Sequence, residues 1–421
     1  MRRQTFLVST FATLSFGLLC ACNHEAPCGP GEIRQGNACL PAGEIPPGEM
    51  PSGETSCTPV ENPPPPATCT EKSRLYAACY ASGHVAVLSP STRNLLARER
   101  VGDNPQALSS VDEVLLCADD GAQRLWRLEA QSLQKLGEVA TGQLPNHVSV
   151  SEDKHHAYII NAASGTLQVV DTQTWKTLPA TVYFGENTYP QTLALMGSCG
   201  FVPLYGNLAG GQTAPGQRLA RVNLSHPTSP RLQGEADFSS LHLYPYAGRT
   251  PIPLPYDVVV HKGFLYVALN NLAADYNPAG PGAIAKVNPH TLEAEVLLLG
   301  DTCLNVVSLA SHGEWLLASC FGEYGNPGTA GVALMEDDKL KNLWTAPPGF
   351  VPGALATPCG ELWVGNANGG DIYVFSTQEG RLQLLRGVGS LGEGGSEGGP
   401  VGACPPGPMG YSSVESLWLK P

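Results

Sequence analysis

One apolar strand recurs seven times between residues 75 and 366, and this repeat limits the possible folds more than any other feature. Its copies are LYAAC (75–79), VLLC (114–117), AYIIN (157–161), FVPLY (201–205), LYVALN (265–270), WLLASC (315–320) and LWVGN (362–366). Successive copies begin 39 to 64 residues apart. A period of this size predicts a series of similar supersecondary units.

The clearest unit is LPNHVSVSEDKHHAYIINAASGTLQVVDTQTWKTL, residues 144–178. It reads as a short apolar segment after Pro145, the run Ala157–Asn161, the strand Thr166–Asp171 and a last strand, with polar turns between them. Four short strands bounded by turn residues predict one antiparallel sheet. We therefore predict an all-β fold over residues 73–421, a seven-bladed β-propeller of four-stranded antiparallel blades.

Two other repeat folds are less consistent with this pattern. A β-solenoid is disfavoured by the four-strand length of the unit, and two β-sandwiches are disfavoured by the single unbroken array. The 48 glycines, 37 prolines and low charged fraction of 14% also indicate many turns and few long helices.

The unit resembles the YVTN family of β-propeller repeats. The YVTN pattern is a Tyr-Val-x-Asn-like strand, then a Val-rich strand ending in Asp, then a Thr-containing turn. Here these parts are Tyr158–Asn161, Val169–Asp171 and Thr172–Thr174. The resemblance spans residues 73–421, is good in blades 1 to 3 and 7, and is looser in blades 4 to 6, where insertions interrupt it. It implies the propeller fold strongly and a function only weakly.

The two ends of the repeat region are complementary. The first strand of the array, Arg74–Cys79, matches the second strand of a blade, so its blade lacks a first strand. The C-terminal MGYSSV (409–414) resembles ALSSV (107–111), which is the first strand of blade 2. We predict that Gly410–Val414 pairs with Arg74–Cys79 and closes the ring, because an open ring would expose unpaired backbone groups at two edges.

The N-terminus reads as an export signal. Arg2 and Arg3 precede an apolar run that ends at Ala21, and the run is too short for a membrane-spanning helix. The junction Leu19-Cys20-Ala21-Cys22 resembles a bacterial lipobox, which implies removal of residues 1–21 as a lipoprotein signal peptide and acylation of Cys22. Acyl chains there would anchor the chain in a lipid bilayer. An ordinary cleaved signal is the alternative.

Asn23 follows the acylation site, and by analogy with lipoprotein sorting this favours the bacterial outer membrane, on its periplasmic or cell-surface side. The net charge is −13. A chain this acidic is not expected to bind nucleic acid. We expect a monomer.

Residues 22–72 form a Cys/Pro/Gly-rich tether. Two small disulfide loops are predicted in it, Cys28 with Cys39 and Cys57 with Cys69. Proline-rich sequence between them cannot bury a core and behaves as a semi-rigid spacer. The Cys loops acting as a binding module is the alternative.

The remaining cysteines read as structural, and thirteen cysteines fit an oxidising compartment. One hairpin register places Cys303 opposite Cys320, which predicts a disulfide. Cys79 could pair with Cys404 or with Cys117. Cys199 and Cys359 occupy equivalent turns of blades 4 and 7, too far apart to bond to each other, so one or both are expected to be free.

The sequence lacks the common catalytic motifs: nucleophile elbow, HExxH, Walker loop, dinucleotide fingerprint and zinc Cys-x-x-Cys pair. The pairs His155-His156, Asp119-Asp120 and Asp337-Asp338 read as turn residues. No cofactor and no metal are expected, and no catalytic residue is assigned.

Long insertions fall on one face of the predicted propeller. Loops after second strands and loops between blades emerge together, and the long ones are Gly206–Gln217, Phe238–Tyr256, Asn271–Gly282, Phe321–Ala330 and Gly389–Gly410. Long loops on a rigid scaffold often carry binding sites. The expected ligand face over blades 4 to 6 consists of Tyr205, Tyr244, Tyr246, Arg249, Asp275, Tyr276, Glu323 and Tyr324. Alternatively, these tyrosines only pack their own loops.

Three functions remain open at this point. The leading one is a membrane-anchored, non-enzymatic scaffold that binds a protein or glycan at the loop-rich face. The alternatives are an enzyme similar to lactonase propellers and a periplasmic redox partner similar to quinoprotein dehydrogenase propellers. The ends of the second strands argue against catalysis because they offer little acid–base capacity: Cys79, Cys117, Asn161, Asn270, Cys320 and Asn366.

Overall fold

The computed structural model describes residues 32–35, 38–41, 57, 69–206, 217–386, 401–405, 414 and 416–420. The chain divides into two compact units, Met1–Glu54 and Thr55–Pro421. Within the first unit, β1 (Glu32–Gln35) pairs antiparallel with β2 (Ala38–Pro41). None of the helices in the described ranges is long and apolar enough to cross a membrane.

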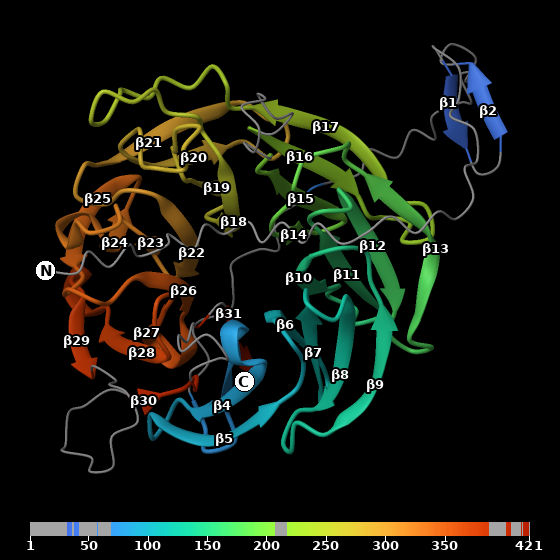
Figure 1. The fold of residues 1–421 in the computed structure, drawn as a ribbon, viewed down its shortest axis with the longest axis horizontal. Helices are drawn as coiled ribbons and strands as arrows, with labels where there is room; N and C mark the ends of the chain where they lie inside the picture. Colours follow the sequence, from blue (N-terminus) through green and yellow to red (C-terminus); the bar gives the residue numbers. More distant parts are fainter. Residues whose placement is uncertain are drawn as a thin grey trace, which may run out of the picture. The chain divides into compact units, whose positions relative to one another are not determined.

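The second unit is a seven-bladed β-propeller, as predicted (Figure 1). Each blade is an antiparallel sheet whose strands follow one another, side by side, from the centre of the ring to its rim. Blade 1 consists of β31 (Ser416–Lys420), β3 (Arg74–Cys79), β4 (His84–Ser89) and β5 (Asn94–Arg100). Blade 2 consists of β6 (Pro105–Val111), β7 (Val114–Asp119), β8 (Arg124–Glu129) and β9 (Lys135–Ala140). Blade 3 consists of β10 (Pro145–Val150), β11 (His156–Asn161), β12 (Thr166–Asp171) and β13 (Lys176–Tyr183).

Blades 4 and 5 are β14 (Ala194–Met196), β15 (Cys199–Leu204), β16 (Arg218–Asn223) and β17 (Arg231–Asp237); β18 (Pro255–His261), β19 (Phe264–Leu269), β20 (Gly282–Val287) and β21 (Ala294–Gly300). Blades 6 and 7 are β22 (Val306–His312), β23 (Trp315–Cys320), β24 (Gly331–Glu336) and β25 (Lys339–Thr345); β26 (Pro352–Ala356), β27 (Glu361–Asn366), β28 (Asp371–Ser376) and β29 (Gln383–Arg386). A further short strand, β30 (Val401–Gly402), pairs with β28.

The second strands form the core of the ring. In six of the seven blades the second strand has five consecutive buried residues, and in β15 all six are buried. Each blade is covered on both faces by its neighbours, so these strands read as continuous apolar runs instead of alternating patterns. This burial explains why the repeat is so visible in the sequence.

Proline marks the start of several first strands. β6, β10, β18 and β26 each begin with Pro, and in all four the pairing register shifts directly afterwards. Proline has no N–H to donate and is tolerated at the first residue of a strand or at a bulge. These strands are also the inner edge of each blade, where one side of the backbone has no sheet partner.

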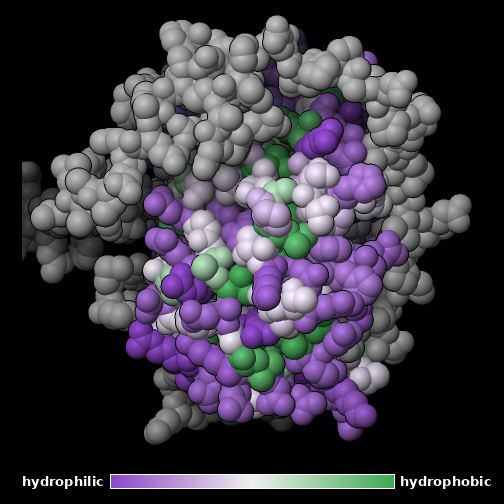
Figure 2. All heavy atoms as spheres, turned by 90° about the vertical axis from the view of Figure 1, so that its right-hand side faces the viewer, coloured by the Kyte–Doolittle hydropathy of each residue, from purple (hydrophilic) through white to green (hydrophobic). Residues whose placement is uncertain are grey.

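The propeller has two distinct ends. The turns between first and second strands and between third and fourth strands lie at one end, which we call the turn face. The connections between second and third strands and between blades lie at the other, the loop face. Figure 2 shows the rim near β13 and β17, which is mainly hydrophilic with scattered apolar side chains.

The C-terminal strand closes the ring, but the predicted segment is wrong. β31, not Gly410–Val414, pairs with β3, with Ser416 opposite Ala78. The N–H of Val414 instead donates to the carbonyl of Asn366 in blade 7, at 3.1 Å. The shift of six residues has a physical reason: a strand ending at Val414 would leave the apolar side chains of Leu417 and Trp418 in water. Leu417 is only 8% exposed, and the Trp418 indole donates to Ser110 Oγ at 3.2 Å.

Cys303 bonds Cys320, as predicted. Of the two partners considered for Cys79, the structure shows Cys404, and Cys117 is free and buried. The predicted loop from Cys57 to Cys69 is wrong.

Cys57 bonds Cys199 of blade 4, and Cys69 bonds Cys359 of blade 7, so neither partner is free. Cys199 is the first residue of β15 and Cys359 lies in the turn before β27, so both partners are at the turn face, where the chain enters blade 1 at β3. Closeness in sequence was therefore a poor guide to pairing. Of the predicted Cys28–Cys39 pair, Cys39 lies in β2, whereas Cys28, the acylation site Cys22 and the signal peptide lie outside the described residues.

Candidate functional site

Loops from different blades meet at Glu323 on the loop face. Tyr246, in the connection between blades 4 and 5, donates its hydroxyl to Glu323 Oε2 at 3.3 Å. Arg249 from the same connection forms an ion pair with Glu323 Oε1 at 3.7 Å. Glu323 lies between β23 and β24 of blade 6, where its N–H donates to Thr329 Oγ1. The structure therefore brings together three of the residues predicted for a ligand face.

A small apolar core supports these loops from below. Leu254 and Leu272 are buried there, and Tyr205, Ile252 and Tyr276 pack around them. The Ile252 N–H donates to the Leu272 carbonyl at 2.9 Å, which joins two of the loops. Burial raises the pKa of Tyr205. Tyr205 and Tyr276 thus pack their own loops, as the alternative interpretation held.

Other predicted residues are presented to solvent. Tyr324 is 88% exposed and Tyr244 is 43% exposed. The Tyr244 hydroxyl donates to Asp301 Oδ1 at 2.9 Å. Hydrogen bonds from Asn277 hold the pKa of the exposed Asp275 below its usual value. We call the exposed and half-buried set the loop-face patch: Tyr244, Tyr246, Arg249, Asp275, Asp301, Glu323 and Tyr324.

The patch has paired aromatic rings and carboxylates. Tyr246 and Tyr244 each direct a hydroxyl to a carboxylate of a different connection, and burial together with that carboxylate raises the pKa of both phenols. Sequence inspection missed Asp301, although it directly follows β21 at the same end of blade 5. Its position after a blade was the signal that could have identified it.

Two titratable side chains on first strands were also missed. Burial raises the pKa of Asp257 to about 6, although the N–H groups of Val258 and Leu309 donate to its carboxylate, each at 2.8 Å. Burial lowers the pKa of His147 to about 4, and its Nε2 lies 2.8 Å from Ser149 Oγ. Because Leu309 belongs to the next blade, Asp257 satisfies an edge group of a neighbouring strand. These contacts give both side chains a structural role.

Substitutions at these two positions should change the pH dependence of stability in opposite directions. The shifted pKa of Asp257 contributes folding stability that is fully present below pH 3.8 and is lost as the pH rises through 6. The shifted pKa of His147 contributes folding stability that is fully present above pH 6.5 and is lost as the pH falls through 4. Each effect amounts to at most about 3 kcal/mol. As the pH rises from 4 to 7, the stability of Asp257→Asn should increase relative to the unaltered chain. Over the same rise, the stability of His147→Gln should decrease relative to the unaltered chain. Guanidinium unfolding across this range measures both; curves parallel to the unaltered chain would contradict the assignment.

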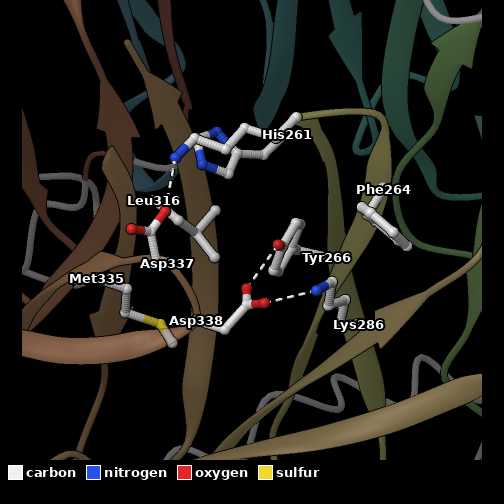
Figure 3. A pocket seen from close by; sticks show the side chains of 9 residues that line it. His261, Phe264, Tyr266, Lys286, Leu316, Met335, Asp337 and Asp338 are labelled. Atoms are coloured by element: carbon white, nitrogen blue, oxygen red, sulfur yellow. Dashed lines mark hydrogen bonds and ion pairs between the residues drawn. The ribbon is translucent and has the colours of Figure 1, made fainter. Parts of the chain in front are cut away.

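A groove of about 190 Å³ lies on the turn face between blades 5 and 6 (Figure 3). Asp338 accepts hydrogen bonds from the Tyr266 hydroxyl at 2.7 Å and from Lys286 Nζ at 2.5 Å. Lys262 Nζ contacts Asp337 at 3.1 Å. The charges of the groove are thus paired with one another across the two blades, which identifies it as an inter-blade contact.

The ends of the second strands also have structural partners. Asn270 Nδ2 donates to the Val306 carbonyl at 2.6 Å, and Asn366 Oδ1 accepts from the Val351 N–H at 3.1 Å. No group of three or more His, Cys, Asp or Glu side chains within the described residues could hold a metal ion.

No protein-family model matches the sequence, and no curated protein is significantly similar to it. Solved structures do match the fold. Hydrazine synthase of Kuenenia stuttgartiensis has a TM-score of 0.54 at 14% identity, over 79% of this chain and 98% of that chain. The WD40 repeats of RRP9 give 0.52 at 10% identity, over 75% and 87%. The dihydro-heme d1 dehydrogenase NirN in complex with DHE gives 0.50 at 13% identity, over 78% and 76%.

These likenesses establish the propeller fold alone. At identities of 10 to 14%, a shared fold carries no activity from one protein to another. The similar structures include proteins named as enzymes and a repeat domain, so the choice between catalysis and binding depends on this chain's own residues.

Proposed function

We propose that the protein is a membrane-anchored scaffold that binds a protein or glycan partner through the loop-face patch. The observation that carries this proposal is the meeting of Tyr246, Arg249 and Glu323 from two separate connections. Loops that only closed the blades would not need to contact one another. Joined loops form a continuous, positioned surface on a rigid ring, which is the arrangement that binding proteins use.

The composition of the patch supports recognition. Tyrosine and arginine dominate the binding energy of many interfaces, because they bury large areas and donate hydrogen bonds. Tyr324 is 88% exposed although it belongs to a connection of only ten residues, 321–330. A large aromatic side chain held in water carries a solvation cost that a bound partner would remove.

Tyr324→Ala should weaken partner capture without affecting folding, because the side chain is almost fully exposed. Loss of a tyrosine at an interface costs more than 1 kcal/mol in favourable cases, so we expect capture from cell-envelope extract to fall at least about fivefold. Tyr183→Ala is the matched control, since Tyr183 is 57% exposed on the rim strand β13, outside the patch. Protease or periodate treatment of the captured material separates protein from glycan.

Equal capture by the Tyr324→Ala variant and the unaltered chain would contradict the proposal. An equal loss in the Tyr183→Ala control would also contradict it, because the captured material would then bind tyrosines generally.

The anchoring part of the proposal rests on the lipobox-like residues that end at Cys22. A chain held by acyl groups at Cys22 would present the propeller at the outer membrane. Cys22→Ala should therefore move the protein from the membrane fraction to the soluble fraction of the envelope, as measured by fractionation and immunoblotting. Unchanged partitioning would show that acylation of this residue is not the anchor.

A further inference from the structure

Lysine is confined to one end of the propeller. The chain has nine lysines. Every one of them lies in a turn of the turn face, next to such a turn, or in the part of a strand nearest to it: Lys72, Lys135, Lys154, Lys176, Lys262, Lys286, Lys339, Lys341 and Lys420. The connections of the loop face therefore contain no lysine in the described residues or in the gaps between them.

The loop-face patch has the opposite composition. Three of its seven members are carboxylates, Asp275, Asp301 and Glu323, and Arg249 is its one cation. Arg249 is already paired with Glu323 at 3.7 Å. Among the described residues, Asp275 and Asp301 form no ion pair within 4 Å. Their hydrogen bonds are with Asn277 and Tyr244, and the nearby charge of Arg249 contributes to the lowered pKa of Asp275. The patch thus carries a net negative charge on an end of the molecule without lysine.

Carboxylates and tyrosine side chains are in contact on this surface. Tyr244 directs its hydroxyl to Asp301, and Tyr246 directs its hydroxyl to Glu323, while Tyr324 stands exposed beside Glu323 in the chain. A guanidinium or ammonium group approaching here meets both a negative charge and ring faces. Cation–π contacts contribute about 0.5–2 kcal/mol each, in addition to the charge attraction.

We infer that the partner contacts the loop-face patch through a cationic protein segment rich in arginine or lysine. The inference rests on the proposed function and adds the chemistry of the partner to it. A neutral glycan would leave the net negative charge of the patch uncompensated, whereas a basic segment complements it. With lysine at the far end, Arg249 is the one cation within the patch, and its charge offsets only one of the three carboxylates.

Lysine placement also gives a direct assay. Coupling the soluble Cys22→Ala chain to a surface through its amines uses the N-terminal amine and the lysines of the turn face, and so leaves the patch exposed. The probe is a twelve-residue Gly-Ser peptide carrying four arginines, and the same peptide carrying four glutamates is the control. We expect salt-sensitive binding of the arginine peptide and no binding of the glutamate peptide.

Two double variants remove the same number of charges from opposite faces. Asp275→Asn/Asp301→Asn keeps the hydrogen-bond acceptors of the patch, and Glu152→Gln/Glu293→Gln acts on exposed turns of the turn face. We expect the first to weaken binding of the arginine peptide about tenfold and the second less than twofold. Equal weakening by both would overturn the inference, because overall charge and not the patch would then be responsible.

The two levels of the proposal fail differently. If the arginine peptide does not bind but Tyr324→Ala still reduces capture from envelope extract, the inference of a cationic partner is wrong, whereas the proposal that the loop-face patch binds a partner still stands. If Tyr324→Ala changes nothing either, both are wrong.

Discussion

Deletion of residues 416–421 is expected to abolish cooperative unfolding of the propeller. β31 supplies the first strand of blade 1, so its loss leaves β3 as an unpaired inner edge. It also removes Leu417 from the core that it shares with Leu75 and Val374. Lost hydrogen bonds and lost burial together cost on the order of 5–10 kcal/mol, comparable with the total stability of a domain.

Calorimetry of the truncated chain measures this effect. We expect a broad, low-enthalpy transition instead of one sharp peak. Leu417→Ala is the graded control, because it keeps the strand pairing and should cost only about 2–3 kcal/mol with the transition still sharp. A truncated chain that melts as sharply and as high as the intact one would show that β31 does not close the ring.

Joint removal of the two disulfides that link the ends of the ring should destabilise the protein more than the sum of the separate removals. Cys79–Cys404 and Cys69–Cys359 span 325 and 290 residues. With either bond present, the other closes an effective loop of only about 55 residues, worth about 4 kcal/mol in the chain-entropy account. The last remaining bond closes a much longer loop. Removal of both should therefore cost about 9 kcal/mol, which brings the protein close to unfolding.

A double-mutant cycle under oxidising conditions tests this prediction. The pairs Cys79→Ala/Cys404→Ala and Cys69→Ala/Cys359→Ala are compared alone and combined by guanidinium unfolding. The control is Cys303→Ala/Cys320→Ala, which opens a loop within blade 6 and should be additive with either pair. Strict additivity between the two long-range pairs would mean that they do not constrain the same opening of the ring.

The blade count was predictable from sequence for a physical reason. Second strands are buried on both faces, so runs such as Leu75–Cys79 and Leu265–Leu269 stay apolar throughout and recur at blade spacing. Turn residues between the strands then fix four strands to a unit. These features are local, and local patterns survive in a single sequence.

The closing strand shows where local patterns fail. Residues 409–414 resemble 107–111 in letters, but pairing with β3 is decided by which segment can bury apolar side chains. Leu417 and Trp418 provide that burial six residues further on. Similarly, Cys57 and Cys69 bond to cysteines that are 142 and 290 residues away in sequence. Contacts of this range depend on the closed ring, which the sequence does not display.

The candidate site was predictable only in part. The long connections lie at one end of the propeller, as loop length indicated, and Tyr246, Arg249 and Glu323 meet there. The roles of individual tyrosines were not predictable, because packing decides whether a ring supports a loop, as Tyr205 does, or projects into solvent. Asp257 was missed because the register shift after Pro255 interrupts the alternation that identifies the exposed side of a strand.

The most direct test of the binding face is photo-crosslinking in intact cell envelopes. A photoreactive phenylalanine analogue is placed at Tyr324 on the loop face or at Phe264, an exposed aromatic of the turn face. We expect irradiation to produce a discrete adduct from position 324 and none from position 264. An adduct from position 264 alone, or no adduct from position 324, would contradict the proposal that the loop-face patch binds the partner.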